Sequence, residues 1–306
     1  MGGRIAVTPR SLSGAGHPAL ARLVERGFEI VYPAPGRTPS EDDLIRTVPG
    51  CVGWLAGVEP ISNRVLDAAT GLRVISRNGT GVDNLDVAAA ETRGIAVERA
   101  VGANARGVAE LAIALLLAGF RHIPWSHDHL KKGDWQRRIG REVRGRTLAV
   151  IGCGAIGRDV VDMALGLGME VIGYDPYPGH SFARPGFRFA PLAEALRLAD
   201  AVSLHCPPAG RPILDAGAIA TLRPGVVVVN TARAELIDEG AMLEGLDSGR
   251  VQALATDVFV AEPPPPSALL SHERVILMPH AGGLTDESVE RATRVAVDNL
   301  LKVLAQ

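Results

Sequence analysis

Three side chains in the C-terminal part of the chain, Arg233, Glu262 and His280, are of the types needed for acid/base chemistry on a small anion. An arginine holds a carboxylate and a neighbouring oxo group with two parallel hydrogen bonds, which a lysine cannot do. An imidazole donates or accepts a proton near neutral pH, and a carboxylate partner fixes its tautomer. We therefore expect Arg233 to hold a substrate while His280, paired with Glu262, transfers a proton.

Each of these residues also has a structural interpretation without chemistry. Arg233 can be a surface charge at a strand end, and Glu262 can be an ordinary carboxylate in a proline-rich loop. His280 can cap the helix expected over Asp286–Leu304. Together with Asp257, however, all three are expected at the edge of a parallel sheet where the strands end and ligands collect. This shared location favours the catalytic interpretation.

A glycine-rich turn lies between a strand expected over Thr147–Ile151 and a helix expected over Arg158–Leu167. Gly152 allows a tight turn, Gly154 lets a pyrophosphate approach the backbone, and Gly157 lets the helix pack close to the strand. The helix N-terminus also offers unpaired N–H groups to a phosphate. The order of elements predicts a dinucleotide site, although the glycines alone would also fit a turn without a ligand.

Asp175 ends the next expected strand, Met169–Tyr174, about 20 residues beyond Gly152. At this spacing a carboxylate accepts hydrogen bonds from the adenosine ribose and repels a 2′-phosphate, which favours NAD over NADP. Arg158 and Arg184 keep NADP open as an alternative, because either can lie close to that phosphate. NAD combined with Arg233, Glu262 and His280 predicts hydride transfer to or from C2 of a 2-hydroxy or 2-oxo acid.

A second anion-binding segment is expected over Arg77–Asn84, directly after a strand. Gly79 and Gly81 would expose backbone N–H groups there to a substrate carboxylate. A plain turn leading into a helix over Val87–Thr92 is the alternative interpretation.

Strands and helices alternate along the chain, which predicts an α/β fold with parallel sheets covered by helices on both faces. In the first hundred residues we expect strands at Arg4–Pro9, Phe28–Tyr32, Cys51–Leu55 and Arg73–Ser76, and helices at Ala19–Arg26, Glu41–Thr47, Arg64–Ala69 and Val87–Thr92. Beyond Asp175 we expect strands at Ala201–Leu204, Val226–Asn230, Gln252–Thr256 and Val275–Met278, and helices at Leu192–Leu198, Ala216–Leu222, Ala241–Ser248 and Asp286–Leu304. A long apolar helix over Asn104–Phe120 is followed by an irregular excursion, Arg121–Arg141, which we interpret as a dimer arm.

The 306 residues are enough for two domains, and the content of 47% hydrophobic and 22% charged residues is ordinary for a globular enzyme. A formal net charge of −2 gives no basic footprint for nucleic acid. The longest apolar run, Leu111–Phe120, is too short to cross a bilayer, and the N-terminus lacks a secretory signal, so we expect a cytoplasmic protein.

The three cysteines, Cys51, Cys153 and Cys206, form neither an even framework nor a CxxC pair, so we expect reduced, buried and inert thiols. Cys153 would face the cofactor edge, although a packing role is the favoured interpretation. His127 and His129 would point to different sides of a helix, so no metal site is expected.

Several ordered motifs resemble those of the D-isomer-specific 2-hydroxyacid dehydrogenases, and are most similar to short phosphoglycerate dehydrogenase-like members. The motifs are Arg77–Asp86, Gly152–Gly157, Tyr174-Asp-Pro176, Asn230-Thr-Ala-Arg233, Asp257-Val-Phe-Val-Ala-Glu262-Pro and Pro279-His280-Ala-Gly-Gly. The resemblance implies two doubly wound parallel-sheet domains separated by a cleft. A Rossmann NAD-binding domain, residues 101–285, would be inserted in a flavodoxin-like substrate-binding domain, residues 1–100 plus 286–306, with the C-terminal helix packed on the N-terminal sheet.

The resemblance also assigns roles to individual residues. It implies Arg233, Glu262 and His280 as catalytic residues, and a homodimer. No metal, nucleic-acid or membrane partner is expected from the charge, the apolar runs and the histidine spacing described above. The residues expected to bind NAD are Thr80, Gly152, Gly154, Ala155, Ile156, Gly157, Asp175, His205, Cys206, Pro207, Thr231, Ala232, Asp257, Ala281 and Gly282. Those expected to bind the substrate are Asn78, Gly79, Arg106, Arg233 and His280.

Departures from the family pattern leave the substrate open. Leu55-Ala56-Gly57-Val58 replaces a basic residue that phosphoglycerate enzymes tend to have, and Arg106 can be either a replacement anion contact or a surface charge. Ala234 stands where relatives have a glycine, which predicts a shifted pocket. Glu262 argues against formate, because formate dehydrogenases use an amide there. We expect no regulatory domain after Gln306 and therefore no serine feedback.

A function of a different class stays open beside the enzyme. The same fold and catalytic residues occur in transcriptional corepressors, so an NAD(H)-sensing regulatory protein with little turnover is the alternative.

Overall fold

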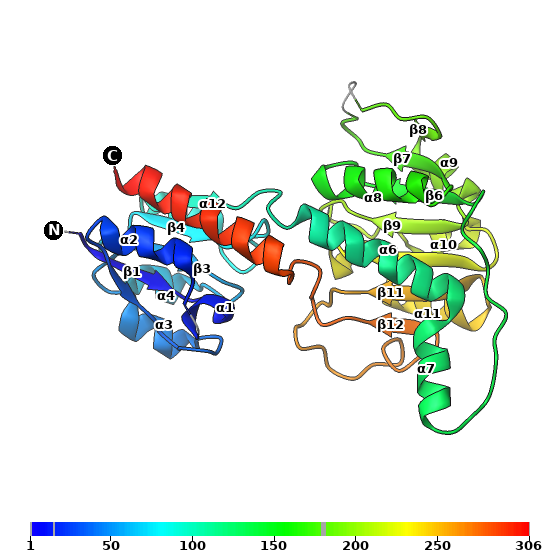
Figure 1. Cartoon of the computed structure of the whole chain (residues 1–306), viewed down its shortest axis with the longest axis horizontal. Helices are drawn as coiled ribbons and strands as arrows, with labels where there is room; N and C mark the ends of the chain where they lie inside the picture. The colour runs from blue at the N-terminus through cyan, green and yellow to red at the C-terminus, as the bar shows by residue number, and fades with distance from the viewer. Residues whose placement is uncertain (1, 15, 179–181, 306) are drawn as a thin grey trace. The chain divides into compact units, whose positions relative to one another are not determined.

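The computed structural model describes residues 2–14, 16–178 and 182–305 of the chain. The chain forms two compact units (Figure 1). Unit 1 comprises Met1–Asn104 and Leu284–Gln306, and unit 2 comprises Ala105–Gly283. Each unit has one parallel sheet with helices on both faces, which confirms the predicted α/β class.

Unit 1 is built on a five-stranded sheet in the order β2-β1-β3-β4-β5. The strands are β1 (Arg4–Val7), β2 (Glu29–Val31), β3 (Cys51–Ala56), β4 (Val74–Arg77) and β5 (Ala96–Arg99). One face is covered by α2 (Ala21–Glu25) and α12 (Asp286–Leu304), and the other by α3 (Glu41–Thr47), α4 (Asn63–Ala68) and α5 (Val87–Thr92). The short elements α1 (Arg10–Ser13) and η1 (Pro18–Leu20) precede α2.

Helix α12, drawn red in Figure 1, returns from the end of the chain to pack on the N-terminal sheet. Its buried residues Ala296, Val297 and Leu300 contact a core that includes Ile5 and Val74. This position agrees with what the family resemblance implied for the C-terminal helix.

Unit 2 is built on a seven-stranded sheet in the order β12-β11-β10-β9-β6-β7-β8. Its strands are β6 (Thr147–Ile151), β7 (Glu170–Tyr174), β8 (Phe187–Phe189), β9 (Ala201–Leu204), β10 (Val226–Asn230), β11 (Val251–Thr256) and β12 (Val275–Leu277). Helices α6 (Ala105–Arg121) and α8 (Ala155–Gly166) bury one face, and α9 (Leu192–Leu198), α10 (Ala216–Thr221) and α11 (Glu239–Asp247) bury the other. The central strands of this sheet are rich in apolar residues because helices cover both faces of the sheet.

The segment after α6 was wrongly expected to be irregular, because it contains the helix α7 (Ile123–Lys131). His122 has a left-handed backbone, with φ of 53°, which ends α6, and Pro124 fits the first turn of the new helix. The indole of Trp125 packs against the imidazole of His129 at 3.9 Å and under the guanidinium of Arg138 at 3.9 Å. Stacking of this kind holds α7 to the chain that follows it.

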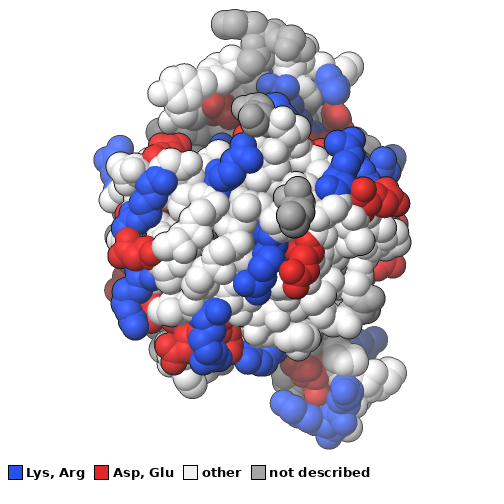
Figure 2. All heavy atoms as spheres, turned by 90° about the vertical axis from the view of Figure 1, so that its left-hand side faces the viewer, with Lys and Arg blue, Asp and Glu red and all other residues white. Residues whose placement is uncertain are grey.

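The molecule's surface carries basic and acidic side chains interspersed over the face shown in Figure 2. In the part of the chain that the structure describes, no single helix has the length and hydropathy of a membrane span. Helices α6 and α7 meet that test only as a pair, and the two are bent by 64°.

A buried acid, Glu59, lies just beyond β3 in unit 1 and is only 1% exposed. Burial raises the pKa of Glu59, against the opposing effects of hydrogen bonds from Thr8 and the backbone and of the charge on Arg77. A raised folded-state pKa means that the stabilising contribution is complete below the unfolded pKa and is lost as the pH rises through the folded pKa.

The charge of Glu59 is therefore expected to reduce stability as the pH rises. Glu59→Gln removes the titration, so the melting temperature of the wild type should fall relative to that of the variant as the pH is raised above the ordinary carboxyl range. Thermal unfolding of both proteins across acid to neutral pH measures this difference. A constant difference over the whole range would contradict it.

Candidate functional site

The carboxyl ends of the unit 2 strands carry most of the residues predicted to act on cofactor and substrate. The glycine turn follows β6, and Gly152 has a φ of 94°, which suits glycine. A Cβ on Gly157 would lie 2.0 Å from the carbonyl oxygen of Gly152, so only glycine lets α8 approach the strand. Around Gly154, by contrast, no atom lies within 4 Å of an added Cβ. The turn thus has the tight and the open positions that a dinucleotide site requires.

Helix α8 begins at Ala155, earlier than the predicted start at Arg158, and so begins inside the glycine turn. Its N-cap residue, Gly154, has no side chain to cap the first turn. The N–H groups of Ala155 and Ile156 therefore point out of an uncapped helix end, where a phosphate would be favoured.

Asp175 lies beside the glycine turn. Its Oδ2 accepts a hydrogen bond from the backbone N–H of Cys153 at 2.8 Å, and its Oδ1 accepts one from Tyr177 at 2.8 Å. These bonds fix the carboxylate while leaving each oxygen a further lone pair for a ribose hydroxyl. Arg184 pairs with Asp162 at 2.7 Å, so its guanidinium is engaged on α8. Arg158 donates to the carbonyl of Cys153 at 3.0 Å and thus stays near the turn.

Asp175→Ala is expected to weaken NADH binding by roughly 10- to 100-fold, because it removes a charge-assisted hydrogen bond to the ribose. NADPH affinity should rise relative to that of NADH, because the repulsion of the 2′-phosphate is also lost. Fluorescence titration with both cofactors measures the two dissociation constants. Glu244→Ala, which removes an exposed carboxylate on α11, is the matched control. An unchanged NADH to NADPH preference in Asp175→Ala would contradict this role.

The cysteines differ in part from the prediction. Cys51 and Cys153 are buried and Cys206 is half-buried, and all three are free. The Cys153 side chain belongs to the core cluster under α8, so its role is packing and it does not face the cofactor edge. Burial raises the pKa of Cys153 to about 12, which keeps it an unreactive thiol.

Two buried polar atoms lie at the ends of neighbouring strands without a partner among the described residues. They are Nδ1 of His205, which follows β9 together with Cys206 and Pro207, and Oγ1 of Thr231, which follows β10. The other ring nitrogen of His205 is 2.7 Å from Oγ of Ser203. Burial lowers the pKa of His205 to about 3, so the ring is neutral. Unsatisfied buried atoms favour a polar ligand at this edge, and with the uncapped helix they fit NAD.

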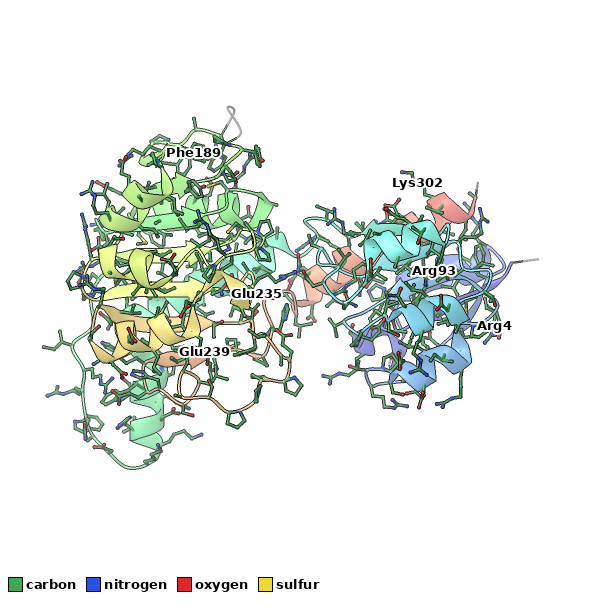
Figure 3. The ribbon with its side chains drawn as sticks, turned by 180° about the vertical axis from the view of Figure 1, so that it is seen from behind. Arg4, Arg93, Phe189, Glu235, Glu239 and Lys302 are labelled. Carbon is green, nitrogen blue, oxygen red and sulfur yellow. The ribbon has the colours of Figure 1, made fainter. Side chains whose placement is uncertain are left out.

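The turn that carries Arg233 is held by a residue that the sequence reasoning missed. The Asn230 side chain, 1% exposed, donates to the carbonyl of Arg233 at 2.8 Å and accepts from the N–H of Ala232 at 3.1 Å. The guanidinium Nη1 of Arg233 donates to the carbonyl of Ala232 at 2.6 Å. Ala234 begins the short helix η2 (Ala234–Leu236), in which Glu235 is labelled in Figure 3. The φ of Ala234 is not positive, so its backbone does not require glycine.

His280 and Glu262 form a direct pair. The imidazole Nδ1 lies 2.7 Å from Oε2 and 2.9 Å from Oε1 of Glu262. The carboxylate accepts, so Nδ1 carries the proton and Nε2 is the nitrogen left for a substrate. Glu262 is held in turn by the N–H of Phe259, at 3.2 Å. Helix α12 is capped by Thr285, so His280 is not its cap.

Asp257 fixes the chain on the far side of His280. It is 2% exposed, and its two carboxylate oxygens accept from the N–H groups of Ala281 at 2.7 Å and Gly282 at 2.8 Å. His280 itself has a φ of 54°. The carboxylate of Asp257 therefore holds an otherwise unfavourable backbone in place, in addition to any contact that it makes with the cofactor.

Asn78, Gly79 and Thr80 lie in unit 1, at the carboxyl end of β4. The N–H of Asn78 donates to the carbonyl of Ala56 at 2.8 Å, and its Oδ1 has no partner among the described residues. The carbonyl of Gly79 accepts from the N–H of Ala100 at 3.0 Å, and the hydroxyl of Thr80 contacts the same residue's carbonyl oxygen at 3.4 Å. An available acceptor beside a fixed backbone is compatible with the predicted substrate contact.

The guanidinium of Arg106 is paired with a carboxylate on its own helix. It lies on α6, and its Nε donates to Glu110 at 2.7 Å in an exposed i,i+4 pair. Such pairs contribute little to stability. No group of three or more His, Cys, Asp or Glu residues suited to a metal occurs in the described part of the chain.

A comparison with family models identifies unit 2. Residues 113–282 match the D-isomer specific 2-hydroxyacid dehydrogenase, NAD binding domain. The chain belongs to the D-isomer-specific 2-hydroxyacid dehydrogenase family, as its motifs predicted, and NAD is the cofactor of the matched domain.

Individual relatives agree with this family. The D-3-phosphoglycerate dehydrogenase of Methanocaldococcus jannaschii is 41% identical over 250 residues, which are 80% of this chain and 48% of the relative. The human D-3-phosphoglycerate dehydrogenase is 38% identical over 258 residues, 82% of this chain and 48% of the relative. The chain thus spans about half the length of these curated relatives.

A solved structure covers the chain more completely. The crystal structure of the TT0316 protein from Thermus thermophilus is 34% identical and covers 99% of this chain and 97% of its own, with a TM-score of 0.89. A glyoxylate reductase from Paecilomyes thermophila is 25% identical, with a TM-score of 0.85, and covers 100% of this chain and 96% of its own. The likeness extends over both units.

Proposed function

We propose that the protein is an NAD-dependent oxidoreductase that acts between C2 of a D-2-hydroxy acid and the corresponding 2-oxo acid, and that it is phosphoglycerate dehydrogenase-like. The observation that carries this proposal is the His280–Glu262 pair at the sheet edge that holds the glycine turn. When bound, NAD supplies or accepts the hydride. The names of the relatives support the reaction class.

The chain's own residues divide the remaining work. Arg233 holds the substrate carboxylate and the neighbouring oxygen in a bidentate contact. His280 Nε2 donates a proton to the oxo oxygen during reduction and accepts the hydroxyl proton during oxidation, while Glu262 fixes the tautomer through Nδ1. Asn230 and Asp257 position these two segments. Unit 1 serves as the substrate-binding domain through Asn78 and Gly79.

We further propose a cytoplasmic homodimer. The segment after α7 exposes large apolar side chains, with Trp135 77% and Ile139 95% exposed. A second copy of the chain would cover these side chains, because exposed aromatic and aliphatic groups favour an interface. Sedimentation of the purified chain measures its mass in solution, and a monomer at all concentrations would contradict the dimer.

NADH oxidation by the purified protein, measured against a panel of 2-oxo acids, tests the reaction. The panel contains glyoxylate, hydroxypyruvate, phosphohydroxypyruvate, 2-oxoglutarate and phosphonate-bearing analogues. We expect turnover of at least one member and loss of that turnover in Glu262→Ala. Tight NADH binding without turnover of any acid would oppose an enzyme and favour an NAD(H)-sensing protein. Preference for a phosphorylated acid would require an anion contact, for which Arg106 is the candidate.

A further inference from the structure

Glu59 is a buried carboxyl group that the proposed reaction does not use. It belongs to the loop after β3, in which its neighbour Val58 is 69% exposed while Glu59 is 1% exposed. Placing an ionisable side chain inside a fold is costly unless its oxygens are hydrogen-bonded. Its presence at the carboxyl edge of the unit 1 sheet therefore calls for a structural or functional reason.

The carboxyl group joins three parts of unit 1. Its Oε1 accepts from the N–H of Gly57 at 2.9 Å and also makes a short hydrogen bond with the hydroxyl of Thr8, which follows β1. The same hydroxyl oxygen accepts from the indole N–H of Trp54 on β3 at 3.0 Å. Thr8 and Trp54 are themselves buried. The hydroxyl of Thr8 thus links the carboxyl group of Glu59 to the indole of Trp54.

The loop after β3 is in turn fastened to the loop after β4. The Asn84 side chain donates to the carbonyl of Glu59 at 2.6 Å and to that of Gly57 at 3.3 Å. The N–H of Ile61 donates back to the carbonyl of Asn84 at 2.8 Å. The segment over 77–86, which ends with this contact, contains the predicted substrate contacts Asn78 and Gly79. A change in Glu59 can therefore reach those residues through Asn84.

The packing around Gly57 shows how closely the parts fit. A Cβ added there would lie 2.7 Å from Oε2 of Glu59 and 3.1 Å from Cα of Pro9. A side chain at position 57 would therefore displace the carboxyl group of Glu59. A closely packed hydrogen-bonded network of this kind favours one arrangement of its side chains.

We propose that Glu59 is a positioning residue for substrate binding: its buried carboxyl group fixes the segment over 57–61 and, through Asn84, the segment over 77–86 that presents Asn78 and Gly79. The substrate part of this inference rests on the proposed function, whereas the loop-fixing part does not. Glu59 belongs to unit 1, whereas the glycine turn and the acid/base pair belong to unit 2.

The test compares Glu59→Ala, Glu59→Gln and Asn84→Ala in the full chain, with Glu25→Ala on the exposed surface of α2 as the control. Amide hydrogen exchange and the KM for a 2-oxo acid are measured for each. Glu59→Ala should speed exchange in both segments and raise KM about tenfold, with kcat and the NADH dissociation constant nearly unchanged. Glu59→Gln should behave like the wild type, because an amide oxygen still accepts from Gly57 and Thr8.

Asn84→Ala separates the two loops and also covers the case in which Glu59→Ala fails to fold. It should raise KM as Glu59→Ala does and speed exchange over 77–86 while leaving 57–60 protected. Unchanged exchange over 77–86 in both alanine variants would overturn the proposal. A fall in kcat and in NADH affinity as large as the rise in KM would also overturn it, because such a pattern indicates general destabilisation. If the wild type turns over no 2-oxo acid, the proposed function fails, and exchange still decides whether Glu59 fixes the loops.

Discussion

His280→Ala is expected to lower kcat by roughly 100- to 10,000-fold, because general acid/base transfer at the substrate oxygen is lost. NADH affinity should survive, since the glycine turn and Asp175 hold the cofactor without help from the imidazole. Stopped-flow measurement of NADH oxidation under single-turnover conditions separates the chemical step from product release.

A matched control is available for the removal of an imidazole. His127→Ala removes an exposed imidazole from α7, a helix that carries none of the proposed site residues. This variant should leave kcat unchanged. Near-normal turnover in His280→Ala would exclude that residue as the acid/base and would leave the proposed reaction without a proton donor.

Arg233→Lys is expected to lower kcat/KM by roughly 100-fold while keeping the positive charge. A lysine ammonium is a point charge and cannot hold the carboxylate and the oxo oxygen with two parallel bonds. The loss of one charge-assisted hydrogen bond accounts for an effect of about this size. Steady-state kinetics with the best acid of the panel measure the ratio.

The control for this variant is Arg223→Lys. Arg223 lies just before β10, and Arg233 lies just after it. Arg223 is exposed and lies 3.7 Å from Asp200, so a lysine should replace it without effect. Equal kcat/KM values in Arg233→Lys and the wild type would show that charge alone suffices and would contradict the bidentate contact.

The central strands could be predicted from the sequence, whereas two edge strands could not. Continuous apolar runs such as Val226–Asn230 are recognisable because both faces of the sheet are covered. The missed strands, β5 and β8, are only 4 and 3 residues long, contain charged residues and each pair with a single neighbour at an edge. Their conformation depends on the adjacent strand more than on their own composition.

The candidate site also has features that could be predicted from the sequence and features that could not. The positions of candidate side chains near strand ends were predictable, because Asp175 directly follows β7 and Arg233 lies shortly after β10. The hydrogen bonds that hold these segments were not predictable, because those of Asn230 and Asp257 depend on turn geometry and on contacts across the chain. Glu59 shows the limit most clearly. A glutamate in a glycine- and proline-containing loop gives no sequence signal of being buried.

The left-handed backbone of His280 has a consequence for engineering. A glycine at this position would adopt a φ of 54° without the cost that a side chain incurs, which is about 1 kcal/mol or more. A search for thermostable variants that screens only melting temperature would therefore tend to select glycine at position 280. Under the acid/base role proposed for His280, such a variant would be folded but inactive, so any stabilised version of the chain must be screened for turnover as well.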